Sequence, residues 1–299
     1  MQHHVGQRLK EYLLLIRLPN VFTVPSNILA GYFAAITAAE ADGMHIAALV
    51  VSSCLLYVAG IVLNDFFDIE IDKRERPFRP LPSGNISKRH ALSIAMIAVL
   101  VANTIALILG PTSFALSLAL TLAIIAYDYR LKHGLLGPFA MGAARFLNVI
   151  FGASLVLAYV SNHSYALVGI AAASLFVYII AITILSKKEA GNEKPNSTLA
   201  FLMVFGVISV IAALGLLLLQ LQWTFLLNLS IFATVMIITF KQHLMKSLPS
   251  VQKAIRNMVI SIIILDSVFV TGTAGLLYGL ATLLLIVPAV VLAKKLYVT

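Results

Sequence analysis

Charged residues are scarce in this chain of 299 residues, of which 11% are Asp, Glu, Lys or Arg and 61% are hydrophobic. The mean hydropathy of +0.99 is too high for the surface of a water-soluble domain, so the composition excludes soluble and disordered proteins. A single cysteine, Cys54, excludes an internal disulfide. The net charge of +9 is typical of the loops of a membrane protein, and we expect no nucleic-acid partner.

Long apolar runs dominate the chain, and a helix needs about 20 residues to cross a bilayer. They predict an all-α protein, a polytopic transmembrane helical bundle with nine or ten spans, forming a single domain over residues 1–299. The expected spans are residues 21–38, 46–63, 90–109, 113–128, 138–159, 165–185, 199–220, 224–240, 256–274 and 279–293. Nine spans would result if the last two runs, separated by a hinge at residues 276–279, formed one kinked or re-entrant element.

The distribution of basic residues predicts the orientation of these spans. Lys and Arg cluster in alternate connections, and only Arg145 lies inside a span. By the positive-inside rule, both termini are cytoplasmic. The N-terminal segment 1–20 and the acidic loops 64–89 and 186–198 would then also face the cytoplasm.

The scarce acidic residues gather where the second span ends. The cluster comprises Asp65, Asp68, Glu70, Asp72 and Glu75. If the helix continues at about 100° per residue, Asp65, Asp68 and Asp72 share one face and Glu70 points away. Three like charges repel one another unless a cation lies between them, and oxygen ligands of this kind suit Mg²⁺. Asn64 directly precedes the cluster and would join the ligands.

A structural alternative is that these carboxylates pair with nearby basic residues in a solvated loop. Candidate partners for such pairs are Lys73, Arg74, Arg76 and Arg79. The one-sided spacing and the position at a membrane surface favour a functional site instead.

A second acidic pair, Glu189 and Glu193, follows the sixth span. The two side chains share a face if the helix persists through Gly191 and Asn192. Two acidic helix ends, one from each half of the bundle, could hold two Mg²⁺ ions on opposite sides of one diphosphate.

Basic and aromatic residues could complete such a site. Arg79, Lys132 and Arg145 are candidate diphosphate ligands, and the ring of Tyr127 could stabilise a cation. Lys132 could instead be a topology anchor.

Two ionisable residues inside the spans need partners. For Arg145 these could be Asp128, Asn148 or a bound anion. Asp266, in the ninth run, could be protonated or paired with a cation at a helix end.

The pattern Asn64-Asp65-x-x-Asp68-x-x-x-Asp72, followed by Arg79-Pro80 and Ser83-Gly84, resembles the first Asp-rich signature of the UbiA superfamily of intramembrane prenyltransferases. Residues 127–132 and 145–152 are similar to further elements of that family. Glu189 and Glu193 stand where the family has its second Asp-rich motif, with Glu in place of Asp. The two ends of the chain look more like an EboC-like bacterial branch.

The resemblance implies a central cavity with Mg²⁺ at its cytoplasmic mouth, in the inner (plasma) membrane of a bacterium. The expected reaction is transfer of a prenyl group from an isoprenyl diphosphate to a small, lipophilic or aromatic acceptor. The expected catalytic residues are Asp68, Asp72 and Lys132. The expected metal ligands are Asn64, Asp65, Asp68, Asp72, Glu189 and Glu193, and the diphosphate ligands are Arg79, Lys132, Arg145 and Tyr127.

Two other functions remain open at this point. One is a transporter or lipid-binding accessory protein on the same scaffold. The other is a CDP-alcohol phosphatidyltransferase, which also uses Asp clusters at a helix end. The second fits less well, because Ile69-Glu70 follows Asp68 where that class has a different spacing.

Overall fold

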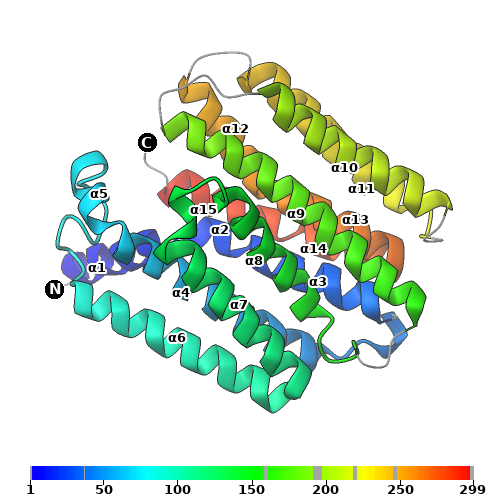
Figure 1. The fold of residues 1–299 in the computed structure, drawn as a ribbon, viewed down its shortest axis with the longest axis horizontal. Helices are drawn as coiled ribbons and strands as arrows, with labels where there is room; N and C mark the ends of the chain where they lie inside the picture. Colours follow the sequence, from blue (N-terminus) through cyan, green and yellow to red (C-terminus); the bar gives the residue numbers. More distant parts are fainter. Residues whose placement is uncertain are drawn as a thin grey trace.

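The computed structural model describes residues 2–36, 38–157, 161–190, 197–217, 221–244 and 248–296. Within these ranges the chain is helical with no strand, which confirms the all-α prediction. The long helices run roughly side by side in a flattened bundle (Figure 1). The elements are α1 (Gln2–Leu15), α2 (Leu18–Val21), α3 (Thr23–Ala35), η1 (Ala38–Glu40), α4 (Gly43–Phe67), α5 (Ile69–Glu75), α6 (Lys88–Leu109), α7 (Pro111–Tyr129), η2 (Leu131–His133), α8 (Gly137–Gly152), α9 (Asn162–Ala190), α10 (Ser197–Leu217), α11 (Phe225–Thr239), η3 (Phe240–Leu244), α12 (Leu248–Ile260), α13 (Ile262–Ala274), α14 (Leu276–Leu283) and α15 (Ile286–Leu296).

Each of the ten apolar runs contains a helix, and eight helices in the described residues are long and apolar enough to cross a membrane. A ninth is counted if the segments Arg8–Leu15 and Leu18–Ala35, bent by 46°, form one span. Helix α8, with 16 residues, is shorter than the roughly 20 that a full crossing needs. The chain is therefore an integral membrane protein.

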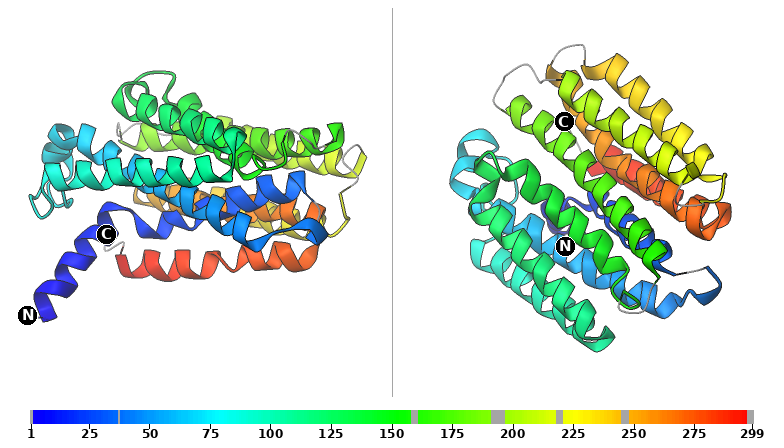
Figure 2. Two further views of the ribbon diagram at one scale, coloured as in Figure 1. Left: turned by 90° about the horizontal axis from the view of Figure 1, so that it is seen from below. Right: turned by 45° about the vertical axis from the view of Figure 1, so that its right-hand side comes forward.

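The expected hinge at residues 276–279 is wrong, because the chain turns one residue earlier. Gly275 adopts φ 95°, a conformation that favours glycine, and residues 276–279 already belong to α14. Helices α13 and α14 pack against each other, so the last two runs form two helices rather than one kinked element. Helix α15 then packs against α1 and α2 and brings the described C-terminal end close to the N-terminal helices (Figure 2).

Small residues allow close helix packing on one face of α6. Its buried positions are a stripe of alanines at helical spacing: Ala91, Ala95, Ala98, Ala102 and Ala106. This stripe packs against α4, and Ser52 of α4 donates a hydrogen bond of 2.9 Å to the carbonyl oxygen of Ala102. The opposite face carries exposed Met96, Ile97 and Leu100, as expected of a surface that faces lipid.

Helix α3 lies at the centre of the bundle and contacts α4, α8, α9 and α13. Its buried face carries polar residues, including Ser26 and Asn27, in addition to apolar ones. These polar side chains need partners from the surrounding helices, because the bilayer offers none. Helix α3 thereby links the N-terminal half of the bundle, which carries the first acidic motif, to the C-terminal half.

Candidate functional site

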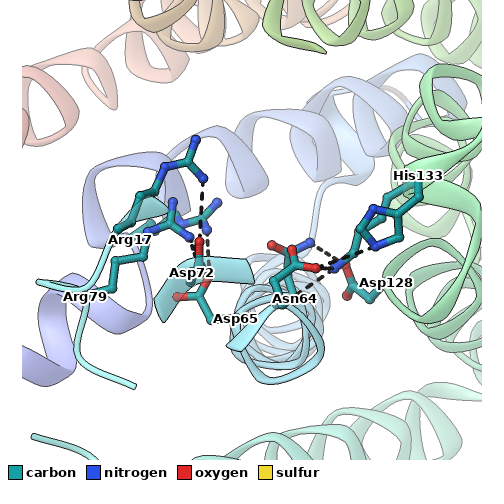
Figure 3. Close-up of polar contacts among 10 residues, drawn as sticks. Arg17, Asn64, Asp65, Asp72, Arg79, Asp128 and His133 are labelled. Carbon is teal, nitrogen blue, oxygen red and sulfur yellow. Dashed lines mark hydrogen bonds and ion pairs between the residues drawn. The ribbon is translucent and has the colours of Figure 1, made fainter. Parts of the chain in front are cut away.

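The first acidic motif lies at a break between two helices. Helix α4 ends at Phe67, Asp68 has φ −90° and ψ 4°, and α5 begins at Ile69. The expectation that Asp65, Asp68 and Asp72 share one face assumed an uninterrupted helix. The break separates them: Asp65 and Asp72 converge on Arg79 (Figure 3). Asp68 instead pairs with Lys132.

Three arginines pair with the two buried carboxylates, and the most distant of them, Arg76, places Nη1 3.7 Å from Asp72 Oδ1. Arg79 Nη1 lies 2.7 Å from Asp72 Oδ2 and 3.4 Å from Asp65 Oδ1. Arg17 Nη2 lies 2.7 Å from the same Asp65 oxygen. Arg17 is the only described residue other than glycine with a positive φ, 47°, which a non-glycine residue adopts at a conformational cost. This unusual backbone, at the bend between α1 and α2, accompanies the placement of its guanidinium at the motif.

The loop that carries Arg79 is held by the core. Leu81 and Ile86 are buried in one cluster with Leu15 and Ile69, and Ile86 N donates a hydrogen bond of 3.1 Å to Pro80 O. The arginine is therefore positioned by packed hydrophobic residues on either side of the loop.

The structural alternative, pairing in a solvated loop, describes Glu70 well. Its exposed carboxylate lies 2.9 Å from Lys73 Nζ and 3.4 Å from Lys88 Nζ. The hydrogen bond from Lys73, and then that from Lys88, holds the pKa of Glu70 below its usual range. Glu70 points away from the motif, as the helical spacing predicted.

Lys132 and Asn64 join the motif to the end of α7. Lys132 lies in the short helix η2, is 8% exposed, and places Nζ 2.7 Å from Asp68 Oδ1 and 3.4 Å from the carbonyl oxygen of Asn64. The amide nitrogen of Asn64 donates a hydrogen bond of 2.9 Å to Asp128 Oδ1. The two carboxyl groups on this side, Asp68 and Asp128, therefore face one lysine and one amide, and His133 Nε2 lies 3.6 Å from Asp68 Oδ1.

Asp128 is a site residue that the sequence reasoning missed, having considered it only as a partner for Arg145. It is buried and belongs to the wall of a cavity that Asn64 and Tyr127 also line. The sequence contained a signal for Asp128, because burying a carboxylate at the end of an apolar span costs free energy and therefore indicates a functional residue. Asp128 adds a fourth carboxylate near the three of the first motif.

The cavity has a volume of about 350 Å³ and runs inward from this motif. Arg17, Asn64 and Asp128 line its outer part, and the walls are mostly apolar side chains. The apolar lining residues include Leu56, Ile61, Leu120, Ile124, Ile179 and Ile182, contributed by α4, α7 and α9. The space therefore combines a charged opening with many apolar side chains in its walls.

Arg145 lies apart from the residues of the first motif. Its Nη1 donates a hydrogen bond of 2.9 Å to Asn27 Oδ1, and its guanidinium lies 5.4 Å from the centre of the Tyr57 ring. Of the expected partners, Asn148 is close, since it donates to the same Asn27 oxygen at 3.3 Å, whereas Asp128 instead bonds to Asn64. Its expected role as a diphosphate ligand stays a prediction.

Asp266 also has its partners in the membrane interior. Its Oδ2 accepts hydrogen bonds of 2.6 Å from Ser26 Oγ and from Asn27 Nδ2. Asn27 thus bridges the carboxylate of Asp266 and the guanidinium of Arg145 with the two ends of one amide. Within the described residues, no basic side chain forms an ion pair with Asp266, and no helix end contacts it.

We expect the Asn27 bridge between Asp266 and Arg145 to stabilise the fold measurably. Asn27→Ala removes the hydrogen bonds to both charged groups, and we expect the free energy of unfolding to fall by about 1–2 kcal/mol. Thermal denaturation of the purified protein in detergent measures this, with the exposed Asn85→Ala as the control. Equal melting temperatures for the two variants would contradict the bridging role.

The second acidic pair cannot be placed with the first. Helix α9 continues through Ala190, so the backbone of Glu189 is helical, but its side chain and all of Glu193 lie outside the described residues. Across the described part of the chain, no group of three His, Cys, Asp or Glu side chains is arranged to hold a metal ion. The donors at the motif are nonetheless hard oxygens, including the buried Asp68 Oδ1 that faces Lys132, and oxygen ligands of this kind fit Mg²⁺.

A helical membrane bundle with an acid-rimmed apolar cavity defines the class of protein. Residues 24–194 match the UbiA prenyltransferase family, and the chain belongs to that family. The match includes the first acidic motif, the residues around Lys132 and Arg145, and Glu189.

Several curated relatives of the chain are digeranylgeranylglyceryl phosphate synthases of archaea. The chain is 35% identical over 147 residues to a digeranylgeranylglyceryl phosphate synthase of Saccharolobus solfataricus. The aligned stretch covers 48% of this chain and 51% of that protein. The chain is 37% identical over 112 residues to the enzyme of the same name from Korarchaeum cryptofilum, covering 37% of this chain and 40% of that protein. The matched part thus spans about half the length of these relatives or less.

Solved structures share the fold over most of the chain. A structure of digeranylgeranylglyceryl phosphate synthase has a TM-score of 0.64 at 21% identity and covers 90% of this chain and 100% of its own. A UbiA homologue from Aeropyrum pernix has a TM-score of 0.67 at 16% identity, covering 83% and 96%. A UbiA homologue from Archaeoglobus fulgidus, bound to GPP and Mg²⁺, has a TM-score of 0.56 at 16% identity, covering 91% and 99%. These likenesses confirm the fold; the EboC-like branch stays a prediction.

Proposed function

We propose that this chain is an Mg²⁺-dependent prenyltransferase that moves a prenyl group from an isoprenyl diphosphate to the hydroxyl group of a glyceryl phosphate lipid. The observation that carries the proposal is the cavity, whose opening is lined by Arg17, Asn64 and Asp128. Arg17 in turn pairs with Asp65, which is also the partner of Arg79. Such an opening offers both oxygen donors for a cation and cations for a diphosphate.

The metal ligands we propose are Asn64, Asp65, Asp68 and Asp72, with Glu189 and Glu193 from the other half of the bundle. The UbiA homologue solved with GPP and Mg²⁺ supports this choice of metal. Bound Mg²⁺ would offset the negative charge that develops on the departing diphosphate. The arginine pairs of Asp65 and Asp72 then have to loosen, which leaves Arg17 and Arg79 free to bind phosphate oxygens.

Side chains of the protein itself would bind the diphosphate, stabilise the prenyl cation and exclude water. Arg79 and Lys132, each already beside a motif carboxylate, bind the diphosphate as the bond between its oxygen and the prenyl C1 breaks. The ring of Tyr127, in the cavity wall, faces the allylic cation that forms. The apolar walls exclude water until the acceptor oxygen bonds to C1 and its proton is released.

The acceptor is the point at which the comparisons differ from the sequence prediction. They give no support to an aromatic acceptor, whereas the name of the matched relatives denotes a glyceryl phosphate that carries two geranylgeranyl groups. We therefore propose the glyceryl phosphate class. The bacterial inner membrane, the cytoplasmic orientation of the opening and the single domain over residues 1–299 remain proposals too.

Product formation tests the proposed reaction. Purified protein in lipid nanodiscs would receive geranylgeranyl diphosphate, Mg²⁺ and either geranylgeranylglyceryl phosphate or a hydroxybenzoate, with products identified by mass spectrometry. We expect a diether product from the first acceptor. A product from the hydroxybenzoate alone would contradict the proposed acceptor and restore the aromatic one.

A further inference from the structure

A second polar layer lies inside the cavity, beyond its apolar walls. It consists of Ser53 and Tyr57 of α4 and of Arg145 and Asn148 of α8, all of which line the cavity. Ser53 lies 11 residues before Asn64 in the same helix, a distance of roughly 16 Å at 1.5 Å per residue, and Tyr57 lies roughly 10 Å from it. We call this set the inner polar layer.

Apolar residues separate the inner polar layer from the opening. Gly60, Ile61 and Ile124 line the cavity between the two. A ligand that used both layers would place one polar group at each and an uncharged part between them.

Most N–H donors of the Arg145 guanidinium have no acceptor among the described residues. It carries five N–H donors, and within the described residues its only hydrogen-bond acceptor is Asn27 Oδ1. That acceptor is a neutral amide, and no carboxylate of the described residues forms an ion pair with Arg145. A cation in an apolar region is costly without an anion, so the remaining donors favour an anionic ligand in the cavity.

The surrounding contacts hold Arg145 in place for such a ligand. Asn27 fixes one side of the guanidinium, and the Tyr57 ring covers it at 5.4 Å. Asn148 is fixed from two sides, because it accepts a hydrogen bond of 2.5 Å from Ser53 and donates to Asn27 at 3.3 Å. Asp266 lies behind Asn27, bonded to its amide nitrogen, and does not occupy the donors of Arg145.

We infer that the inner polar layer is the subsite for the anionic group of the acceptor, with Arg145 as its ligand and specificity-determining residue. The inference rests on the proposed function and replaces the expected role of Arg145 as a diphosphate ligand. The anion is a phosphate or a carboxylate, since both match the planar fork of a guanidinium. The prenyl diphosphate, bound at the opening, would then present its C1 to the acceptor hydroxyl from the other side.

Binding to nanodisc-embedded protein with Mg²⁺ tests the inference. The probes are a non-cleavable geranylgeranyl thiodiphosphate, geranylgeranylglyceryl phosphate, its neutral counterpart geranylgeranylglycerol, and a hydroxybenzoate. For wild type we expect the phosphate probe to bind at least about tenfold more tightly than the neutral one. Equal affinities would overturn the inference without any variant, and the hydroxybenzoate arm shows whether a carboxylate replaces the phosphate.

Variants then assign the effect to Arg145. In Arg145→Gln we expect binding of the anionic probe to weaken by about tenfold to a hundredfold, and binding of the neutral probe and the thiodiphosphate to stay within about twofold. The control is Arg89→Gln, at an exposed position of α6, which makes the same change of charge. It should change the affinity for none of the three probes. Arg145→Lys keeps the charge but loses the fork, and a several-fold loss is expected there too, which covers the case in which Arg145→Gln does not fold.

The outcomes separate the two proposals. Failure of wild type to bind the thiodiphosphate would overturn the proposed function itself. Normal thiodiphosphate binding, with unchanged affinity for the anionic probe in folded Arg145→Gln or Arg145→Lys, would overturn the inference alone. Weakening of thiodiphosphate binding as strong as that of the anionic probe would restore Arg145 as a diphosphate ligand.

Discussion

Asp68→Ala is expected to lower the turnover of prenyl transfer by about 10²–10³-fold. Asp68 lies at the break between α4 and α5, and its carboxylate contacts Lys132 rather than the arginines that hold Asp65 and Asp72. Within the described residues, it is the one carboxylate of Asp65, Asp68 and Asp72 that no arginine contacts. Its loss removes a proposed metal ligand and leaves Lys132 without its anion, so the charge at the departing diphosphate is offset less well. Initial rates at saturating Mg²⁺ measure the change.

Glu70→Ala is the matched control for this prediction. Glu70 lies two residues away in the same motif, but it is exposed and pairs with Lys73 and Lys88. We expect its turnover to stay within about twofold of wild type, because exposed ion pairs contribute little. Normal turnover in Asp68→Ala would contradict its assignment as a metal ligand. An equal loss in Glu70→Ala would show that the motif acts through overall charge rather than through positioned ligands.

Gly31→Ala is expected to destabilise the fold by about 3 kcal/mol or more. A Cβ atom at Gly31 would lie 1.8 Å from the carbonyl oxygen of Val149, so α3 and α8 would have to move apart. The same crossing is close on the other side, where a Cβ at Gly152 would lie 2.4 Å from the carbonyl oxygen of Ile28. Contacts with backbone atoms cannot be relieved by rotating a side chain. The crossing also positions Asn27 opposite Arg145, so the inner polar layer should be lost with it.

Thermal unfolding in detergent and size-exclusion profiles measure this effect. Gly169→Ala in α9 is the control, since a Cβ there would meet nothing within 4 Å. It should match wild type or be slightly more stable, because alanine favours helix over glycine. A Gly31→Ala protein as stable as Gly169→Ala would mean that α3 and α8 do not cross as closely as described.

The positions of the helices follow from the sequence, whereas the geometry of the acidic motif does not. Apolar runs of bilayer length predict helices through burial alone, and each of the ten runs contains one. The break at Asp68 has no glycine or proline to mark it; it depends on how α5 packs through Ile69 against Leu81 and Ile86 in the following loop. Periodicity therefore placed Asp65, Asp68 and Asp72 on one face, and tertiary packing separated them.

The inner polar layer illustrates a second limit. Asp266 was conspicuous in the sequence as a carboxylate inside a span, but its donors Ser26 and Asn27 are 240 and 239 residues away along the chain. No local pattern links three helices that meet only in the folded bundle. Sequence reasoning could state that Arg145 and Asp266 needed partners, and the structure supplies Asn27 as the partner of both.

Release of diphosphate by the purified protein tests the central claim most directly. A series of isoprenyl diphosphates of increasing length would be offered with geranylgeranylglyceryl phosphate, with and without Mg²⁺, and free diphosphate measured over time. The proposed function predicts release that requires Mg²⁺ and is fastest for one range of chain lengths. Folded protein that releases no diphosphate from any of them would contradict it and indicate a binding or transport role on a prenyltransferase scaffold.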